Sequence, residues 1–130
     1  MEIYEIFDAV ESVKSREEKM EVLVNNDCLA LRDILKINFD SNLTIHVSKK
    51  LSWTPSVAPT NSLKDITKFL VPLSKGNVEQ DRADASFVAL LESVHPMDAQ
   101  ILTEAVAGKL KVKGLTSKLI KGVWGERIIS

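Results

Sequence analysis

The residues from 80 to 108, QDRADASFVALLESVHPMDAQILTEAVAG, decide the fold of this chain. Their apolar residues recur at intervals of three and four, which is the spacing of one face of an α-helix. The pattern predicts a helix over about 80–94, and Pro96 fits the first turn of a second helix that ends before Gly108. We expect the buried residues of this pair to be Ala83, Phe87, Leu90, Leu91, Val94, Met97, Ile101, Leu102, Ala105 and Val106.

The same period extends in both directions from this pair. It predicts helices over 2–13, 16–24 and 28–38, a helix from Leu63 to about Leu70 with Pro72 just beyond, and a last helix that begins at Thr116 or Ser117. Start and stop signals accompany these segments, such as the capping box of Ser15 and Glu18. The residues expected to face inward are Ile3, Ile6, Phe7, Val10, Val13, Met20, Leu23, Val24, Leu31, Ile34, Leu35, Leu119, Ile120, Val123 and Trp124.

Between the third and fourth of these helices the pattern changes. Residues 43–48 alternate apolar and polar side chains, which is a short strand signature, but no second strong strand accompanies it. Residues 48–61 hold two prolines and several hydroxyl residues and predict a loop. The expected fold is therefore mainly all-α, with about seven short helices in one domain of residues 1–130 and at most one minor strand pair around 43–48.

Composition narrows the class of protein. The hydrophobic fraction of 45% and the charged fraction of 27% are ordinary for a soluble globular protein. Cys28 is the single cysteine, so no intrachain disulfide can form and a reducing compartment is expected. The acidic first ten residues are not a signal peptide, and no apolar run approaches a membrane span, so no membrane partner is expected.

The chain offers little that could carry catalysis. Its two histidines, His46 and His95, have no cysteine cluster with zinc spacing nearby, and His95 before Pro96 is a natural helix cap. Neither of the glycine-rich phosphate-binding motifs is present. We therefore expect no catalytic residue, no metal site and no cofactor, and a protein that is not an enzyme.

A better functional candidate is the basic segment 108–129, GKLKVKGLTSKLIKGVWGERII, which carries six bases and one acid. Residues 1–33 carry nine acids and four bases, although the whole chain has a formal charge of −1. Glycines that admit a close ligand, Gly114 and Gly122, and a helix start near Thr116 would together favour phosphate contact. The candidate contacts are Lys109, Lys111, Lys113, Gly114, Thr116, Ser117, Lys118 and Lys121. The alternative is a solvated lysine face, or one neutralised by the acidic helices of residues 1–33.

A second surface would serve a protein partner instead. Trp53 and Pro55 lie together in the 48–61 loop, and an exposed tryptophan beside a proline would be a good anchor for a protein partner. The competing interpretation is that Trp53 closes the loop over the core.

The chain also resembles known proteins. The order of features in residues 3–50, in SLKDITKFL at 62–70 and in GLTSKLIKGVWG at 114–125 is similar to the N-terminal helical DNA-binding domain of the ATP-dependent DNA ligases of T-even-type bacteriophages. Residues 90–125, with their HPMDA step and KGLT stretch, resemble a family of small uncharacterised proteins of tailed bacteriophages.

The ligase resemblance implies a helical domain that grips duplex phosphates through Gly114, Ser117, Lys118 and Lys121, with Trp124 in the core. The K-x-D-G nucleophile motif of those ligases is absent here, so ligation by this chain is not expected. The expected function is a noncatalytic DNA-binding or DNA-metabolism accessory protein that contacts duplex DNA without sequence specificity. The alternative is a module that binds a host or phage protein. Either would act in the cytoplasm of an infected bacterium or in the virion.

Overall fold

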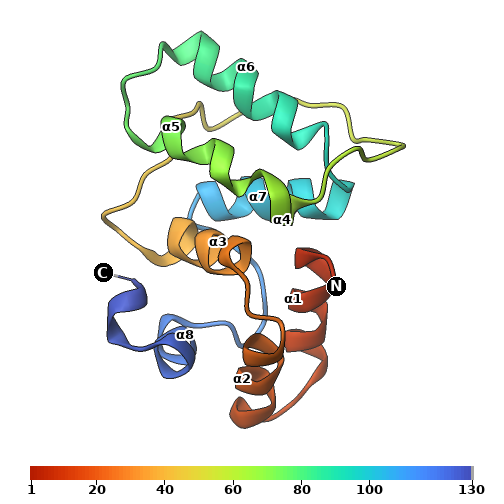
Figure 1. Ribbon diagram of the computed structural model, residues 1–130, viewed down its shortest axis with the longest axis vertical. Coiled ribbons are helices and arrows are strands. Elements are labelled where there is room, and N and C mark those ends of the chain that lie inside the picture. Colours follow the sequence, from red (N-terminus) through yellow and green to blue (C-terminus); the bar gives the residue numbers. More distant parts are fainter. Residues whose placement is uncertain (130) are drawn as a thin grey trace.

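The computed structural model describes residues 1–129, and all regular structure in that range is helical. The chain runs from α1 to α8 with two short 3₁₀ segments, η1 and η2 (Figure 1). The elements are α1 (Ile3–Ser12), α2 (Arg16–Asn25), α3 (Leu29–Phe39), α4 (Leu63–Ile66), η1 (Thr67–Leu70), α5 (Val71–Ser74), α6 (Gln80–Leu91), α7 (Pro96–Val106), α8 (Ser117–Trp124) and η2 (Glu126–Ile128).

The helices lie in two groups with α3 between them (Figure 1). One group holds α4, α5, α6 and α7, and the other holds α1, α2 and α8 at the opposite end of the molecule. Helix α3 packs against α4 and α7, while α2 packs against both α1 and α8. The last α-helix therefore lies beside the second, which places the basic and acidic parts of the sequence side by side.

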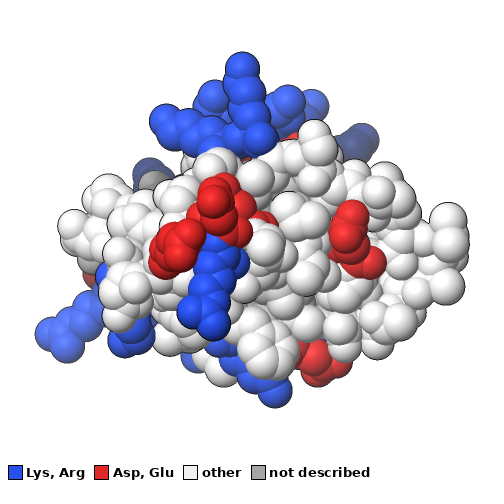
Figure 2. Space-filling model, turned by 90° about the horizontal axis from the view of Figure 1, so that it is seen from above, with Lys and Arg blue, Asp and Glu red and all other residues white. Residues whose placement is uncertain are grey.

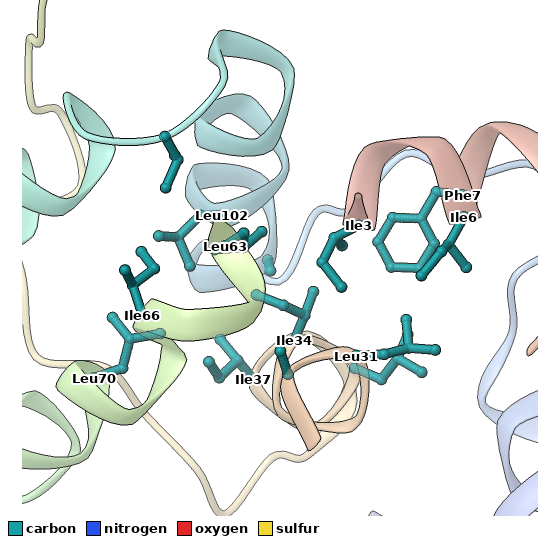
Figure 3. Close-up of a cluster of buried hydrophobic side chains, with 14 of the residues drawn as sticks. Ile3, Ile6, Phe7, Leu31, Ile34, Ile37, Leu63, Ile66, Leu70 and Leu102 are labelled. Atoms are coloured by element: carbon teal, nitrogen blue, oxygen red, sulfur yellow. The ribbon is translucent and has the colours of Figure 1, made fainter. Parts of the chain in front are cut away.

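One continuous core joins the two groups. Figure 3 shows side chains from α1, α3, α4, η1 and α7 pointing toward one another, among them Ile3, Phe7, Ile34, Ile66 and Leu102. All five are at most 2% exposed. Aliphatic side chains dominate this core, as the low aromatic content of 5% requires.

The helix starts follow local sequence. Ser15 accepts a hydrogen bond from the Glu18 amide at 3.1 Å, and the Glu18 carboxylate accepts one from the Ser15 amide at 3.4 Å, so the predicted capping box is present. Thr116 caps α8 by accepting from the Leu119 amide at 3.1 Å. Of the two predicted caps for α8, the structure therefore selects Thr116 over Ser117. Gly125, with φ of +96°, follows the last residue of α8 as expected.

The predicted minor strand pair is wrong within residues 1–129. Residues 43–46 lie outside regular secondary structure. The His46 amide donates to the Leu73 carbonyl, and the Val47 amide donates to the Ile45 carbonyl of the same segment. A ladder needs a partner strand that offers successive backbone groups, and the neighbour of this segment is the helical end of α5 instead. Alternation here buries Ile45 without making a sheet.

The helix predicted over 63–70 is also corrected. It is split into α4, η1 and α5 and continues to Ser74, because Pro72 stands in the first turn of α5, where its missing amide costs no hydrogen bond. The helix predicted over 80–94 ends earlier, at Leu91. With the segment 63–74 counted as one unit and the short η2 left aside, residues 1–129 hold the predicted seven helical segments.

Most predicted core positions are buried or half-buried, but two are exposed. Val24 is 56% exposed and Met97 is 48% exposed. Val24 lies near the end of α2, where Leu23 alone of that helix is fully covered. Met97 stands in the first turn of α7. Both errors have the same cause. An apolar residue near a helix end can fit the three-to-four-residue spacing of a buried face although no neighbouring element packs against it.

Candidate phosphate-binding surface

The start of α8 faces the junction between α1 and α2, and the two parts enclose a shallow depression of about 370 Å³. We call it the basic hollow. Its lining combines basic side chains from both ends of the sequence with a glycine, a hydroxyl and one leucine: Lys14, Arg16, Lys19, Gly114, Thr116, Lys118 and Leu119. Four of these seven residues are basic, and none of the acids described in the structure lines the hollow. Such a surface suits an anion.

The basic side chains that line the hollow differ in whether they already have a partner within the protein. Lys14, Arg16 and Lys118 are exposed, and within residues 1–129 none of them forms an ion pair. Lys19 instead donates from Nζ to the carbonyl oxygens of Val10 at 2.6 Å and Val13 at 2.7 Å. It therefore satisfies the carbonyl end of α1, where a cation is favoured. Three cations thus remain available to a ligand.

Two helix starts meet at the basic hollow. Arg16 is the first residue of α2, and Lys118 is the second residue of α8. The N-terminal end of a helix carries a partial positive charge, so each start adds to the attraction for an anion. The first turn of α2 also holds Glu17 and Glu18, which offset part of that effect there. The first turn of α8 holds no acid.

The two glycines predicted to admit a ligand, Gly114 and Gly122, lie close to flexible side chains of α2. A Cβ on Gly114 would stand 2.7 Å from Lys19 Cε, and a Cβ on Gly122 would stand 2.7 Å from Arg16 Nη2. Gly114 also has φ of +84°, a conformation that favours glycine. The close contacts of both glycines are thus with the protein's own side chains.

The remaining predicted contacts are scattered. Lys109 lines a different depression, described below, and the amides of Lys111 and Lys113 are held by the carboxylates of Glu104 at 3.4 Å and Glu11 at 3.3 Å. Lys121 lies 3.8 Å from Glu126. Ser117 is exposed and makes no side-chain hydrogen bond within the described range. Of the eight predicted contacts, only Gly114, Thr116 and Lys118 therefore share the basic hollow.

Sequence reasoning missed Lys14, Arg16 and Lys19. Residues 1–33 read as an acidic region because their acids outnumber their bases. No local signal shows that these three bases all turn toward one junction, since that depends on α2 packing against α8. The nearest sequence clue is their grouping around the capping box of Ser15.

Within residues 1–129, no ion pair joins the acidic helices of residues 1–33 to the basic segment 108–129. The ion pairs within residues 1–129 are Arg32 with Asp27 and Lys121 with Glu126. The Arg32 guanidinium holds the pKa of Asp27 below its ordinary value, helped by the indole N–H of Trp124, which donates to Asp27 at 3.1 Å. Figure 2, which views the molecule from the α6 end, shows a group of blue Lys and Arg side chains at the top and others at the left and bottom, with red acids between them.

The predicted partner anchor of the loop is not free. Trp53 is half-buried, and its indole nitrogen is fully covered without an acceptor in the described structure. Pro55, two residues on, is exposed. Trp53 lines a depression of about 590 Å³ between the loop and helices α6 and α7, which we call the tryptophan hollow. The interpretation in which Trp53 closes the loop over the body agrees with this position.

A third polar cluster lies where α1 meets α7. Asp98, in the first turn of α7, is completely buried and accepts a hydrogen bond from the Tyr4 amide at 2.9 Å. Burial raises the pKa of Asp98 to about 6, opposed by that hydrogen bond. The ring of Tyr4 stacks on His95 with centroids 4.5 Å apart. His95 itself caps α7 through Nδ1, as its place before Pro96 predicts.

Residues 1–129 contain neither a metal-binding cluster nor a helix that could span a membrane. No group of three or more His, Cys, Asp or Glu side chains is arranged to hold a metal ion. Every helix is too short or too polar to cross a lipid bilayer.

Most of the chain matches the model of a protein family. The model of a family of unknown function, DUF6433, matches residues 6–112. The matched range contains the tryptophan hollow, while the C-terminal side of the basic hollow, from Gly114 to Leu119, follows it. No curated protein matches the chain.

Proposed function

The chain belongs to DUF6433, a family of unknown function, and we propose that it is a noncatalytic protein that binds the phosphate backbone of duplex DNA through the basic hollow. One observation carries the proposal. Three exposed bases, Lys14, Arg16 and Lys118, come from segments about a hundred residues apart and surround the capped start of α8 without an ion pair among the described residues.

The chemistry of the basic hollow favours phosphate over other anions. Lysine and arginine contact phosphate oxygens by charge-assisted hydrogen bonds, and helix starts add backbone donors. Contacts of this kind position a protein on DNA without reading its sequence. The resemblance of the sequence to the DNA-binding domains of T-even-type phage ligases supports duplex DNA as the source of the phosphates. That resemblance also makes the cytoplasm of an infected bacterium the proposed place of action.

The test is fluorescence anisotropy of a labelled duplex at 50 and 150 mM salt. Three phosphate contacts would give a salt slope of about −2.7, so the affinity should fall about 20-fold over that range. The double variant Arg16→Glu and Lys118→Glu should lose binding, because each change places a carboxylate where a phosphate would lie. Circular dichroism of the variant checks that the helices persist.

A matched control carries the same change of charge elsewhere. Lys64 and Lys68 are exposed in α4 and η1 and line neither hollow, so Lys64→Glu with Lys68→Glu should retain most of the binding. Equal losses in the two double variants would show that only net charge matters and would overturn the assignment to the basic hollow. Absence of binding at 50 mM salt would overturn DNA binding itself and favour the alternative, a module for a protein partner.

A further inference from the structure

The tryptophan hollow shares no lining residue with the basic hollow, so what it binds is a separate question. It lies between the segment 44–53, which has no regular secondary structure, and the faces of α6 and α7. Its volume of about 590 Å³ falls within the usual range for small-molecule sites. Figure 1 shows the 40–62 connection running along the α6 side of the molecule.

The interior of the hollow is apolar and partly aromatic. Ile45 and Phe87 are buried at its base, while Trp53 and Val106 are half-buried in its wall. An aromatic wall of this kind gains energy by covering a flat ring, through both burial and stacking. The hollow therefore suits a ligand with a planar body.

The rim of the hollow is basic. Lys49, Lys50 and Lys109 are exposed there, and none forms an ion pair in the range 1–129. Asp84 accepts hydrogen bonds at Oδ1 from the Ser48 amide at 2.7 Å and from the Gln80 side chain at 2.8 Å, and at Oδ2 from the Ser48 hydroxyl. Its oxygens are thus engaged in fixing the rim. Three unpaired ammonium groups select a ligand with more than one negative charge.

We propose that the tryptophan hollow binds a nucleotide, with its base against Trp53 and Phe87 and its phosphate on Lys49, Lys50 and Lys109. A fatty acid fits less well, because it carries one charge and needs an unbroken apolar wall. The lining instead includes Thr44, whose hydroxyl makes no hydrogen bond within residues 1–129 and can bond to the edge of a base.

The covered indole N–H of Trp53 gives the proposal a direct reporter. It has no acceptor among the described residues, and a buried donor left unpaired costs about 1–3 kcal/mol. A base that packs against Trp53 changes the surroundings of this N–H, which NMR detects separately from the indole of Trp124. The protein contains two tryptophans, so each acts as the control for the other.

The experiment is a titration of the ¹⁵N-labelled full chain, followed by ¹H–¹⁵N correlation spectra. Adenosine 5′-monophosphate is the free nucleotide, and single-stranded dT8 presents unpaired nucleotides in a strand. Saturable movement of the Trp53 indole signal, with that of Trp124 unchanged, is the expected result. Adenosine alone and inorganic phosphate alone should each bind at least about tenfold more weakly, because each lacks half of the contacts.

Two double variants make the test specific. Lys49→Glu with Lys50→Glu should weaken nucleotide binding about tenfold or more, whereas Lys64→Glu with Lys68→Glu should leave it unchanged. The dispersion of the same spectra shows whether each variant is folded. Movement with dT8 but not with the mononucleotide would support the site and identify a nucleic acid strand as the source of its ligand.

Other outcomes would overturn the proposal. These are an unmoved Trp53 signal with both probes, equal losses in the two double variants, or movement produced only by an acidic peptide containing phenylalanine. Arg16 and the three lysines of the basic hollow are unchanged in these variants. The result for the tryptophan hollow is therefore independent of duplex binding at the basic hollow.

Discussion

At the scale of single residues, Asp98 holds a position that sequence alone would not assign to a carboxylate. It is fully buried at the junction of α1 and α7, where one oxygen accepts from the Tyr4 amide and the other has no partner in the described structure. The charged groups that act on it are Glu2, Glu5 and His95. Desolvation outweighs the hydrogen bond and the nearby helix starts, so the protonated form is favoured in the folded state relative to water.

The raised pKa of Asp98 determines how the stability of the folded protein depends on pH. The folded-state pKa of about 6 lies above the ordinary 3.8, so the folded protein holds this proton more tightly than the unfolded chain. The stabilising contribution of the protonated carboxyl is fully present below pH of about 4 and is lost as the pH rises through 6. A shift of about two units corresponds to at most about 3 kcal/mol.

Asp98→Asn should therefore change the pH dependence of unfolding. Relative to the wild type, the variant should gain up to about 3 kcal/mol in free energy of unfolding between pH 4 and pH 7. Urea denaturation at pH 4, 5.5 and 7 measures this difference. Asp8→Asn, at an exposed position of α1, controls for the loss of a carboxylate. A parallel pH dependence in the two variants would contradict the role of Asp98.

At the scale of elements, α8 depends on how its first turn is closed. It has only eight residues, which is too short for a helix to be stable alone. The Thr116 hydroxyl satisfies the Leu119 amide, Leu119 and Ile120 are buried, and Trp124 donates to Asp27 beside α3. The cap at one end and the indole at the other hold the helix against α2, and this position brings Lys118 to the basic hollow.

Thr116→Ala should lower the free energy of unfolding by about 1 kcal/mol, because the Leu119 amide loses its acceptor. Ser117→Ala is the matched control, since that hydroxyl makes no side-chain hydrogen bond within residues 1–129 and is exposed. It should change the free energy by less than about 0.5 kcal/mol. Thermal or urea denaturation monitored by circular dichroism compares the two. A larger effect at Ser117 would mean that the cap is misassigned.

At the scale of the whole molecule, one core spans both groups of helices, so they should unfold together. Trp53 reports on the loop beside α6 and α7, and Trp124 reports on α8 at the opposite end. Because α3 packs into the α4–α7 group and the core is continuous with α1, neither group can open without exposing shared apolar surface. We expect one cooperative transition.

Single-tryptophan variants measure this directly. Trp53→Phe leaves Trp124 as the fluorophore, and Trp124→Phe leaves Trp53. In each variant, the urea transition followed by fluorescence should coincide with that followed by far-ultraviolet circular dichroism. Separate midpoints for the two signals within a variant would show that the helix groups unfold independently.

The sequence by itself determined which segments are helical, because period, caps and breakers act within a few residues. The capping box at Ser15, the cap at Thr116 and the stop at Gly125 are all local, and each is present. The errors lie where a local pattern needs a distant partner, as in the unpaired segment 43–48 or the exposed Met97. The distribution of charge along the sequence likewise predicted a basic C-terminal segment, but it did not predict which other charged residues lie beside that segment.

Only the tertiary structure decided which charges stand together. Packing of α2 against α8 brought Lys14 and Arg16 out of an acidic region to Lys118, while the turn of the chain before Gly114 left Lys109 at the tryptophan hollow. Gly114 and Gly122 lie at this junction, where a Cβ on either would meet the side chain of Lys19 or Arg16. A binding surface is made by residues far apart in sequence, and their meeting depends on long-range packing that no local pattern encodes.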